Sequence, residues 1–273
     1  MNSTSPLFYS DLEDHIRRDK RLTVHLAGHR LELDLSFKHE RAYAAKLMLN
    51  LRHPQSDLDE FLFRRFVKPG DTVLDAGANI GFSTWQILSA GASKVIALEP
   101  VPELFERLHQ LNGGTVVAVN KALSSNSGKA SMILSRAHNQ GSSLNPIMVT
   151  LFPNVFAGTS QTIKVDLTTI DDIAIEYGPL DVWKLDVEGA EVAALRGATQ
   201  TLKDAPPRAI IVELYPPFLE EFLSLATARY SFAYRALIRW DPYELVLAPL
   251  NAEISSEFYS SSPMYVFTSE EQI

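Results

Sequence analysis

The 273-residue sequence predicts an α/β protein with a doubly wound, mostly parallel sheet of seven strands. After position 69, short apolar runs rich in Val, Ile and Leu alternate with segments of helical periodicity, as in parallel strands joined by helices. The stretch 72–84 also reads as a buried strand, a tight glycine turn and a helix start, which is typical of open α/β sheets. A turn signal at 68–71 separates this larger domain, 69–273, from an N-terminal region, 1–68.

The expected elements of the larger domain follow from these runs. Main strands are expected at 72–76, 94–98, 115–119, 181–185 and 208–213. Helices are expected at 81–90, 102–111, 189–202 and 217–228. The closing strands, one of them antiparallel, are expected at 232–239 and 264–268, and the low-complexity stretch 255–262 is expected as a loop. An insertion at about 124–170 separates the third and fourth main strands and contributes short strands at 129–134 and 161–166.

The N-terminal region has its own pattern, which predicts a hairpin followed by a helical cap. The stretches 22–26 and 30–35 alternate apolar and polar residues around a glycine, as hairpin strands do. Helical apolar spacing follows at 39–51 and 56–67, with Ser56 as the N-cap of the second helix. We expect these helices to cover part of the cleft of the larger domain, with their aromatic side chains in the core.

Acidic residues follow the first two strands of the larger domain, on either side of the glycine turn. Asp75 ends the first strand, and Gly77 and Gly81 let the backbone turn sharply and approach a ligand closely. Glu99 ends the second strand, close to the ~20 residues beyond the turn at which nucleoside-binding folds place the acid that holds a ribose. Together these residues predict a nucleoside-containing cofactor.

The glycine turn favours S-adenosylmethionine over NAD. A dinucleotide site needs G-x-G-x-x-G so that a pyrophosphate can lie on a helix N-terminus, but Ala78 and Asn79 follow Gly77. Asp75 would repel a pyrophosphate, whereas it suits the ammonium group of S-adenosylmethionine, whose carboxylate the loop amides can hold. The alternatives are an NAD-dependent oxidoreductase and a non-catalytic nucleoside-binding protein. The expected cofactor contacts are Asp75, Gly77, Ala78, Asn79, Gly81, Ser83, Glu99, Pro100, Asn120, Ala122 and Asp186.

Acids also end the fourth and fifth main strands. Asp186 follows the fourth strand, where it should face the transferred methyl group, and Glu213 ends the fifth strand at the same edge. Glu188 and Glu191 are interpreted as acids that stabilise the N-terminus of the next helix. Asn120 follows the third strand and is a candidate for the adenine edge, with a turn cap as the alternative.

Composition excludes several classes of function. The net charge of −8 disfavours nucleic acid, because phosphate backbones are held by clusters of Lys and Arg. Cysteine is absent, which excludes disulfides, zinc–thiolate sites and cysteine nucleophiles. The first residues lack the apolar core of a signal peptide, and no run approaches the ~20 apolar residues of a membrane span. We therefore expect a soluble cytoplasmic protein without nucleic-acid or membrane partners; the oligomeric state is not indicated.

Several of these segments resemble the FkbM-type methyltransferases. The most specific is the Lys-x-Asp-x-Glu-Gly-x-Glu element at 184–191, and the resemblance covers about 43–215. The other segments that agree are 72–81, 97–100, 120–123, 165–173 and 212–213. The resemblance implies a class I methyltransferase (Rossmann-like) fold and S-adenosylmethionine-dependent methylation of a hydroxyl on a macrolide, sugar or other secondary metabolite. It also implies that Ser142 and Ser143 belong to a loop over the active site.

The expected reaction is in-line transfer of a methyl group to a hydroxyl of a small molecule, which requires a base because a protonated alcohol is a poor nucleophile. Asp186 is the first candidate base, Glu213 the second, and His138 on the insertion the third. Lys184 is expected to orient the acid or to stabilise the developing alkoxide. The alternative is that Asp186 and Glu213 hold a divalent cation, but without a recognisable ligand cluster no metal is predicted. The expected substrate contacts are His138, Ser142 and Ser143.

Overall fold

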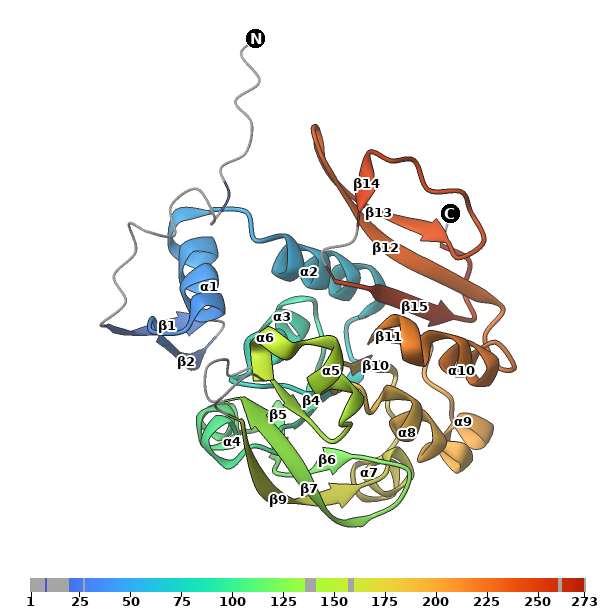
Figure 1. Cartoon of the computed structure of the whole chain (residues 1–273), viewed down its shortest axis with the longest axis horizontal. Coiled ribbons are helices and arrows are strands. Elements are labelled where there is room, and N and C mark those ends of the chain that lie inside the picture. The colour runs from blue at the N-terminus through green and yellow to red at the C-terminus, as the bar shows by residue number, and fades with distance from the viewer. Residues whose placement is uncertain are drawn as a thin grey trace.

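The computed structural model describes residues 8, 20–26, 28–135, 141–156, 160–259 and 262–272. A nine-stranded sheet forms its centre (Figure 1). The strands are β3 (Thr72–Ala76), β4 (Lys94–Leu98), β5 (Val116–Val119), β10 (Val182–Leu185), β11 (Ala209–Glu213), β12 (Phe232–Trp240), β13 (Tyr243–Pro249), β14 (Phe258–Tyr259) and β15 (Met264–Thr268). Their order is β13-β12-β15-β11-β10-β3-β4-β5, and β14 pairs with β12 outside this order, at Ile238 and Arg239.

The sheet agrees with the predicted class and corrects the predicted number of strands. From β11 to β5 neighbouring strands run parallel, and β15 is antiparallel to both β11 and β12. The α/β class and the predicted strands are therefore confirmed, but the sheet has nine strands rather than seven. The two extra strands, β13 and β14, pair with β12 at the edge, and β14 lies inside the stretch predicted as a loop. β13 contains a short apolar run at 245–248 that the prediction overlooked, and β14 has only two residues.

Helices cover both faces of the sheet because its central strands are apolar on both sides. On one face, Val73 of β3 and Val95 of β4 pack with Leu58 and Phe63. On the other face, Leu74 packs in a separate cluster. The first face is covered by α2 (Pro54–Phe66) and α3 (Phe82–Ser89). The second is covered by α7 (Ile170–Tyr177), α8 (Glu191–Arg196), α9 (Thr199–Asp204) and α10 (Pro216–Ala226). Helix α4 (Pro102–Leu108) continues into the short 3-10 helix η3 (His109–Leu111).

The hairpin and the insertion form separate sheets beside the central one. The hairpin pairs β1 (Arg21–Leu26) with β2 (His29–Asp34), as predicted, and is followed by α1 (Lys38–Leu49). The insertion folds into a four-stranded sheet and two short helices at the bottom and centre of Figure 1. Its elements are β6 (Ala122–Leu123), β7 (Gly128–Ser135), β8 (Ser142–Ser143), α5 (Ile147–Leu151), α6 (Pro153–Phe156) and β9 (Ser160–Thr168). No helix of the described part of the chain is long and apolar enough to span a bilayer. The division at 68/69 stays a prediction.

Two helix boundaries differ from the prediction. Helix α2 begins at Pro54, and its N-cap is His53, whose ring accepts a hydrogen bond from the Ser56 amide at 3.4 Å. Proline suits the first turn of a helix, because the amides of that turn have no carbonyl acceptor within the helix. The helix therefore begins two residues earlier than predicted, and the predicted Ser56 N-cap was wrong. The helix predicted at 189–202 is divided into α8 and α9. A side chain at Gly197, where it divides, would approach the carbonyl oxygen of Ser124 to 2.3 Å.

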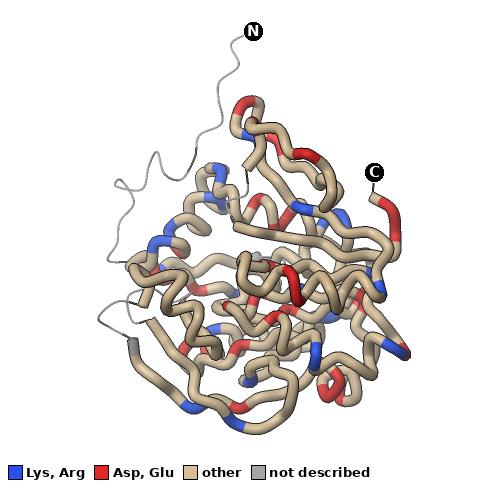
Figure 2. Tube along the Cα trace, turned by 45° about the vertical axis from the view of Figure 1, so that its right-hand side comes forward, with Lys and Arg blue, Asp and Glu red and all other residues tan. Residues whose placement is uncertain are grey.

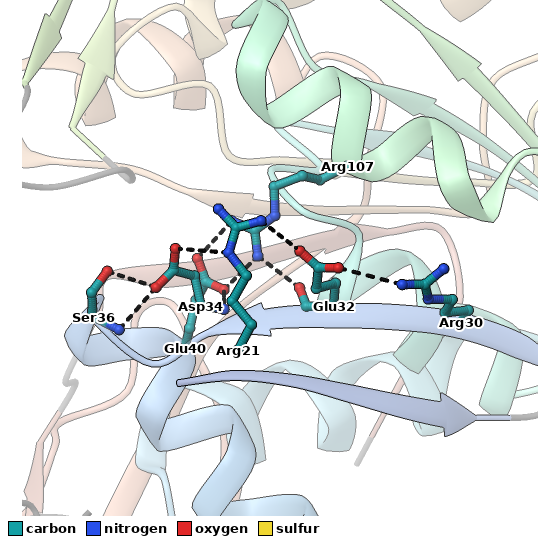
Figure 3. A network of polar contacts seen from close by, with 7 residues as sticks. All are labelled: Arg21, Arg30, Glu32, Asp34, Ser36, Glu40 and Arg107. Atoms are coloured by element: carbon teal, nitrogen blue, oxygen red, sulfur yellow. Dashed lines mark hydrogen bonds and ion pairs between the residues drawn. The ribbon is translucent and has the colours of Figure 1, made fainter. Parts of the chain in front are cut away.

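A buried ion pair fastens the hairpin to the larger domain (Figure 3). Arg107 of α4 reaches across to the hairpin and donates to both carboxylate oxygens of Glu40, at 2.9 and 2.5 Å, and to the carbonyl oxygen of Glu32 at 2.6 Å. Glu40 also accepts a hydrogen bond from the amide of Asp34 at 2.6 Å, and its side chain is completely buried. These bonds fix the hairpin, helix α1 and helix α4 to one another.

Candidate active site

A cavity of about 340 Å³ lies at the carboxyl ends of the parallel strands. The residues that follow β3, β4, β10 and β11 line it, as expected for an open α/β sheet. Helices α1 and α2 contribute a second wall, and α6 of the insertion contributes a third together with Leu144 and Phe152. The predicted site residues that line this cavity are Gly77, Ala78, Asn79, Ser83, Glu99, Pro100, Ala122, Ser142, Lys184, Asp186 and Glu213.

The glycine turn is fixed by close packing and by its own hydrogen bonds. Gly77 has a φ of +76°, and a Cβ there would lie 1.9 Å from the carbonyl oxygen of Asp186. Gly81 has a φ of +92°, and its Cβ would lie 2.3 Å from the side chain of Leu111. Gly81 therefore packs against η3 rather than against the cavity. Only glycine fits both positions without strain.

The amides of this turn bond within the protein. Those of Gly77 and Ala78 donate to the carbonyl oxygen of Leu98, at 3.0 and 2.9 Å. The Asn79 amide donates to Glu99 at 2.9 Å. The next two amides bond within the turn, to the Asn79 side chain and to the carbonyl oxygen of Ala78, both at 2.8 Å. The prediction that these loop amides hold the cofactor carboxylate is therefore not supported by the geometry.

Asp75 lies beneath the cavity and is already occupied. It is completely buried and accepts hydrogen bonds from the hydroxyls of Ser83 and Thr84, at 2.8 and 2.6 Å. The ammonium of Lys184 lies 3.3 Å from its other oxygen. Asp75 therefore positions the start of α3 and Lys184, and it does not line the cavity as a contact for a ligand.

Lys184 links the glycine turn to the acid after β10. Its ammonium donates to the carbonyl oxygen of Gly77 at 2.9 Å and lies 3.4 Å from the carboxylate of Asp186. Burial alone would lower the pKa of Lys184, but Asp75 and Asp186 outweigh it and raise the pKa above its ordinary value. Lys184 therefore stays cationic and holds Asp186 in place, one of its two predicted roles.

Glu99 directly follows β4 at the edge of the cavity. Its carboxylate lines the cavity and accepts the amides of Asn79 and Val101, both at 2.9 Å. Burial raises its pKa to about 7. Asn120 does not line the cavity, because its side-chain amide donates to the carbonyl oxygens of Glu99 and Pro100, at 2.8 and 3.2 Å. The turn-cap alternative therefore describes Asn120 better than the adenine contact.

Three carboxylates converge beside the ends of β10 and β11, which β3 separates from the end of β4 and Glu99. Asp186, Glu188 and Glu213 each place an oxygen within 4.8 Å of the others. The hydroxyls of Tyr215 and Ser262 donate to Glu213, the former at 3.1 Å. Burial, followed by repulsion from the Asp186 carboxylate, raises the pKa values of Glu188 and Glu213 well above the ordinary range. This acid cluster is suited to holding a proton or a cation.

Glu188 was missed as a site acid because its position next to a helix start favoured a capping role. Its backbone has a φ of +52°, and Gly189 follows with a φ of +93°. The resulting bend turns Glu188 toward the cavity, which it lines. Ser143 supports this bend, because its buried hydroxyl donates to the carbonyl oxygen of Glu188. Ser143 therefore does not line the cavity, and His138 lies outside the described residues.

Glu191 has the supporting role that the sequence predicts. One oxygen of its buried carboxylate accepts the amides of Val187 and Gly189, at 3.0 and 3.1 Å. Burial raises the pKa of Glu191 to about 7. Glu191 therefore closes the loop that carries Asp186 and Glu188.

The raised pKa of Glu191 predicts a pH-dependent loss of stability. Between its ordinary value of 4.5 and about 7, the folded protein keeps a proton that the unfolded chain releases, so the stabilisation falls as pH rises through this window. Glu191→Gln keeps the accepting oxygen and removes the titration. Urea denaturation at pH 5 and at pH 7.5 would measure how far the free energy of unfolding falls between these two values. We expect this fall to be roughly 1–3 kcal/mol smaller in the variant than in the wild type. Glu176→Gln, which changes an exposed acid, should show the same pH dependence of the unfolding free energy as the wild type. If Glu191→Gln also showed the wild-type pH dependence, the raised pKa assigned to Glu191 would be wrong.

Residues of the N-terminal helices complete the cavity wall. Tyr43 of α1 and Gln55 and Asp59 of α2 line it. The ring of Tyr43 stacks on that of Phe82 at the start of α3, with centroids 3.9 Å apart and planes inclined by 3°. The expected cover over the cleft is confirmed, but Tyr43 is an aromatic residue that faces the cavity. No spacing in the sequence relates these residues to the strand ends.

Comparison with known proteins identifies the family. A family model for the methyltransferase FkbM domain matches residues 75–238. A search of curated proteins gave no match. Solved structures that resemble the chain include an S-adenosylmethionine-dependent O-methyltransferase from Thermotoga maritima, with 14% identity over 94% of this chain and 88% of that one and a TM-score of 0.41. Another is a putative RNA methyltransferase from Pyrococcus horikoshii, with 13% identity over 80% and 85% and a TM-score of 0.41. The extent of the family match places the chain in the FkbM methyltransferase family.

Proposed function

We propose that this protein transfers a methyl group from S-adenosylmethionine to a hydroxyl of a small molecule. The observation that carries the proposal is the acid cluster of Asp186, Glu188 and Glu213, which shares one cavity with Glu99. A carboxylate at one end suits a ribose, and carboxylates at the other end can accept the proton that a hydroxyl loses on methylation.

The residues present fit the cofactor. Glu99 is held by two amides and offers its carboxylate to ribose hydroxyls, while Pro100 and Ala122 line the adjoining wall. Gly77 presents no side chain where β3 meets the cavity, and Lys184 fixes its carbonyl oxygen. The acidic lining also suits a ligand that carries a sulfonium and an ammonium group. When bound, the cofactor supplies an electrophilic methyl group.

The protein's contribution is to orient the acceptor and to receive its proton. Asp186 is held by Lys184 and lies at the carboxyl end of β10, where it can accept the hydroxyl proton. Glu213 shares the proton within the acid cluster and is positioned by Tyr215 and Ser262. A base whose pKa lies near the working pH transfers protons efficiently, and burial together with the neighbouring carboxylates raises the pKa values of Glu188 and Glu213 above their ordinary range.

The wall of the acceptor end suits an apolar skeleton. Phe152 packs edge-on against Tyr215, whose hydroxyl donates to Glu213, and Leu144 and Phe156 line the same cavity. A secondary metabolite, a macrolide or a sugar-like acceptor with an apolar face is the proposed substrate class. Acidic and basic residues are interspersed along the trace (Figure 2), and we keep the absence of a nucleic-acid or membrane partner and a cytoplasmic location as parts of the proposal.

Ligand binding and a methyl-acceptor screen test this function. We expect S-adenosylmethionine and S-adenosylhomocysteine to raise Tm, and NAD and ATP to leave it unchanged. A screen of hydroxylated small molecules with a labelled methyl donor would then identify the acceptor. Stabilisation by NAD alone would favour an oxidoreductase, and stabilisation without transfer to any acceptor would favour a binding protein.

The acid cluster also suggests a test for a divalent cation. Its three carboxylate oxygens lie close enough to share a metal ion, which is the alternative to a shared proton. We expect turnover to persist after dialysis against EDTA, because the proposed base needs no metal. Loss of turnover that Mg²⁺ restores would replace the base mechanism by metal-assisted activation of the hydroxyl.

A further inference from the structure

Asp59 of α2 is a carboxylate that lines the cavity without a partner. None of the described residues hydrogen-bonds to it or forms an ion pair with it. Burial raises its pKa to about 7, with the Lys184 ammonium opposing the shift and the carboxylates of Asp186 and Asp75 adding to it. Asp59 is only partly exposed, and a cationic ligand in the cavity would supply the partner that its carboxylate lacks among the described residues.

Helix contacts place Asp59 opposite the start of α3. The side-chain amide of Gln86 donates to the backbone carbonyl and hydroxyl oxygens of Ser56, at 2.9 and 3.1 Å. Asp59 follows Ser56 by three positions on α2, and Ser83 precedes Gln86 by three positions on α3, so each pair shares one helix face. The Ser56–Gln86 bonds therefore bring these two faces together, and both Asp59 and Ser83 line the cavity.

This corner offers separate places for two opposite charges. Asp59 provides the negative group, while Ser83 lies in the first turn of α3, where the helix dipole favours a carboxylate. The other polar groups near the turn already have partners within the protein. Asp75 binds the hydroxyls of Ser83 and Thr84 and pairs with Lys184, and the amides of the turn donate to protein oxygens. A free amino acid or an amino-acid tail has the matching pair of charges.

We propose that Asp59 binds the ammonium group of the cofactor's amino-acid tail, with the tail carboxylate at the start of α3. The inference rests on the proposed use of S-adenosylmethionine, and it makes Asp59 a positioning residue. It replaces Asp75 as the expected partner of the ammonium group. The N-terminal helices thus supply a contact that the strand ends of the larger domain do not provide.

The test compares ligands that differ only in this ammonium group. Titration calorimetry would measure Kd for S-adenosylhomocysteine and for its deaminated analogue, with wild type, Asp59→Asn and Asp59→Ala. We expect wild type to bind S-adenosylhomocysteine about 10- to 100-fold more tightly than the analogue, as for a hydrogen bond to a charged group. Both Asp59 variants should lose this preference and bind the analogue within about twofold of wild type.

Controls separate failure of this inference from failure of the proposed function. Glu60→Gln changes the neighbouring acid of α2, which pairs with Lys46 and Arg64, and should keep the preference. If wild type binds neither ligand, the proposed cofactor is wrong. If wild type binds both equally, or if the Asp59 variants keep the preference or lose affinity for both ligands alike, the assignment of Asp59 is wrong although the cofactor stands.

Discussion

Replacing Asp186 with Asn is expected to lower kcat by about 10³-fold, because general-base catalysis by a positioned side chain contributes about 10²- to 10⁴-fold. The amide keeps the shape of the side chain but cannot accept the proton. Lys184 retains its ion pair with Asp75, so the glycine turn should keep its position. Steady-state kinetics with the identified acceptor would measure the loss, and Kd for S-adenosylhomocysteine should stay within about twofold of wild type.

Two further variants make this expectation specific. Asp166→Asn changes an exposed acid of β9 and should leave kcat unchanged. Glu213→Gln should shift the rising limb of the pH–rate profile toward lower pH, because it removes a carboxylate that opposes ionisation of the acid cluster. The carboxylate-base mechanism would be abandoned if neither Asp186→Asn nor Glu213→Gln changed kcat or the pH profile.

Replacing Arg107 with Met is expected to lower the free energy of unfolding by about 3–5 kcal/mol, because it removes the guanidinium that pairs with the buried carboxylate of Glu40. Glu40 is completely buried, so water cannot solvate the charge that remains. The loss would be measured by urea denaturation. The double variant Arg107→Met with Glu40→Gln should recover much of it, since the buried charge is then removed as well.

A surface ion pair provides the comparison. Lys129 and Asp166 pair across β7 and β9, with side chains 74% and 53% exposed, and exposed pairs contribute little to stability. Lys129→Met should therefore change the unfolding free energy much less than Arg107→Met. Equal losses in the two variants, or no recovery in the double variant, would contradict the role assigned to the buried pair.

The sequence was sufficient to locate the strands that are buried along their whole length. The strands from β3 to β11 are short apolar runs, and β12 and β15 were also located. The two-residue strands β6, β8 and β14 are too short for a period, whereas β13 carries an apolar run at 245–248 that the prediction overlooked. At the division between α8 and α9, Gly197 packs closely against the backbone of Ser124, a tertiary contact that periodicity does not encode.

The candidate site was predictable at the strand ends and less so elsewhere. Glu99, Asp186 and Glu213 line the cavity because parallel strands end at one edge of the sheet. Asp75 also lies near the end of a strand, but its carboxylate is buried and accepts hydrogen bonds from the hydroxyls of Ser83 and Thr84. Residues from distant segments, such as Asp59, enter the cavity through helix packing. Their roles therefore needed three-dimensional information.

The packing of α2 against the sheet has a consequence for protein engineering. Leu58 and Phe63 of this helix share one buried cluster with Val73 of β3. A truncation at residue 69 would remove α2 and leave α3 on that face of the sheet, so apolar side chains such as Val73 would become more exposed and the fragment would tend to aggregate. Segments exchanged between relatives to alter acceptor choice should therefore be transplanted from the insertion, while α2 stays with its native sheet.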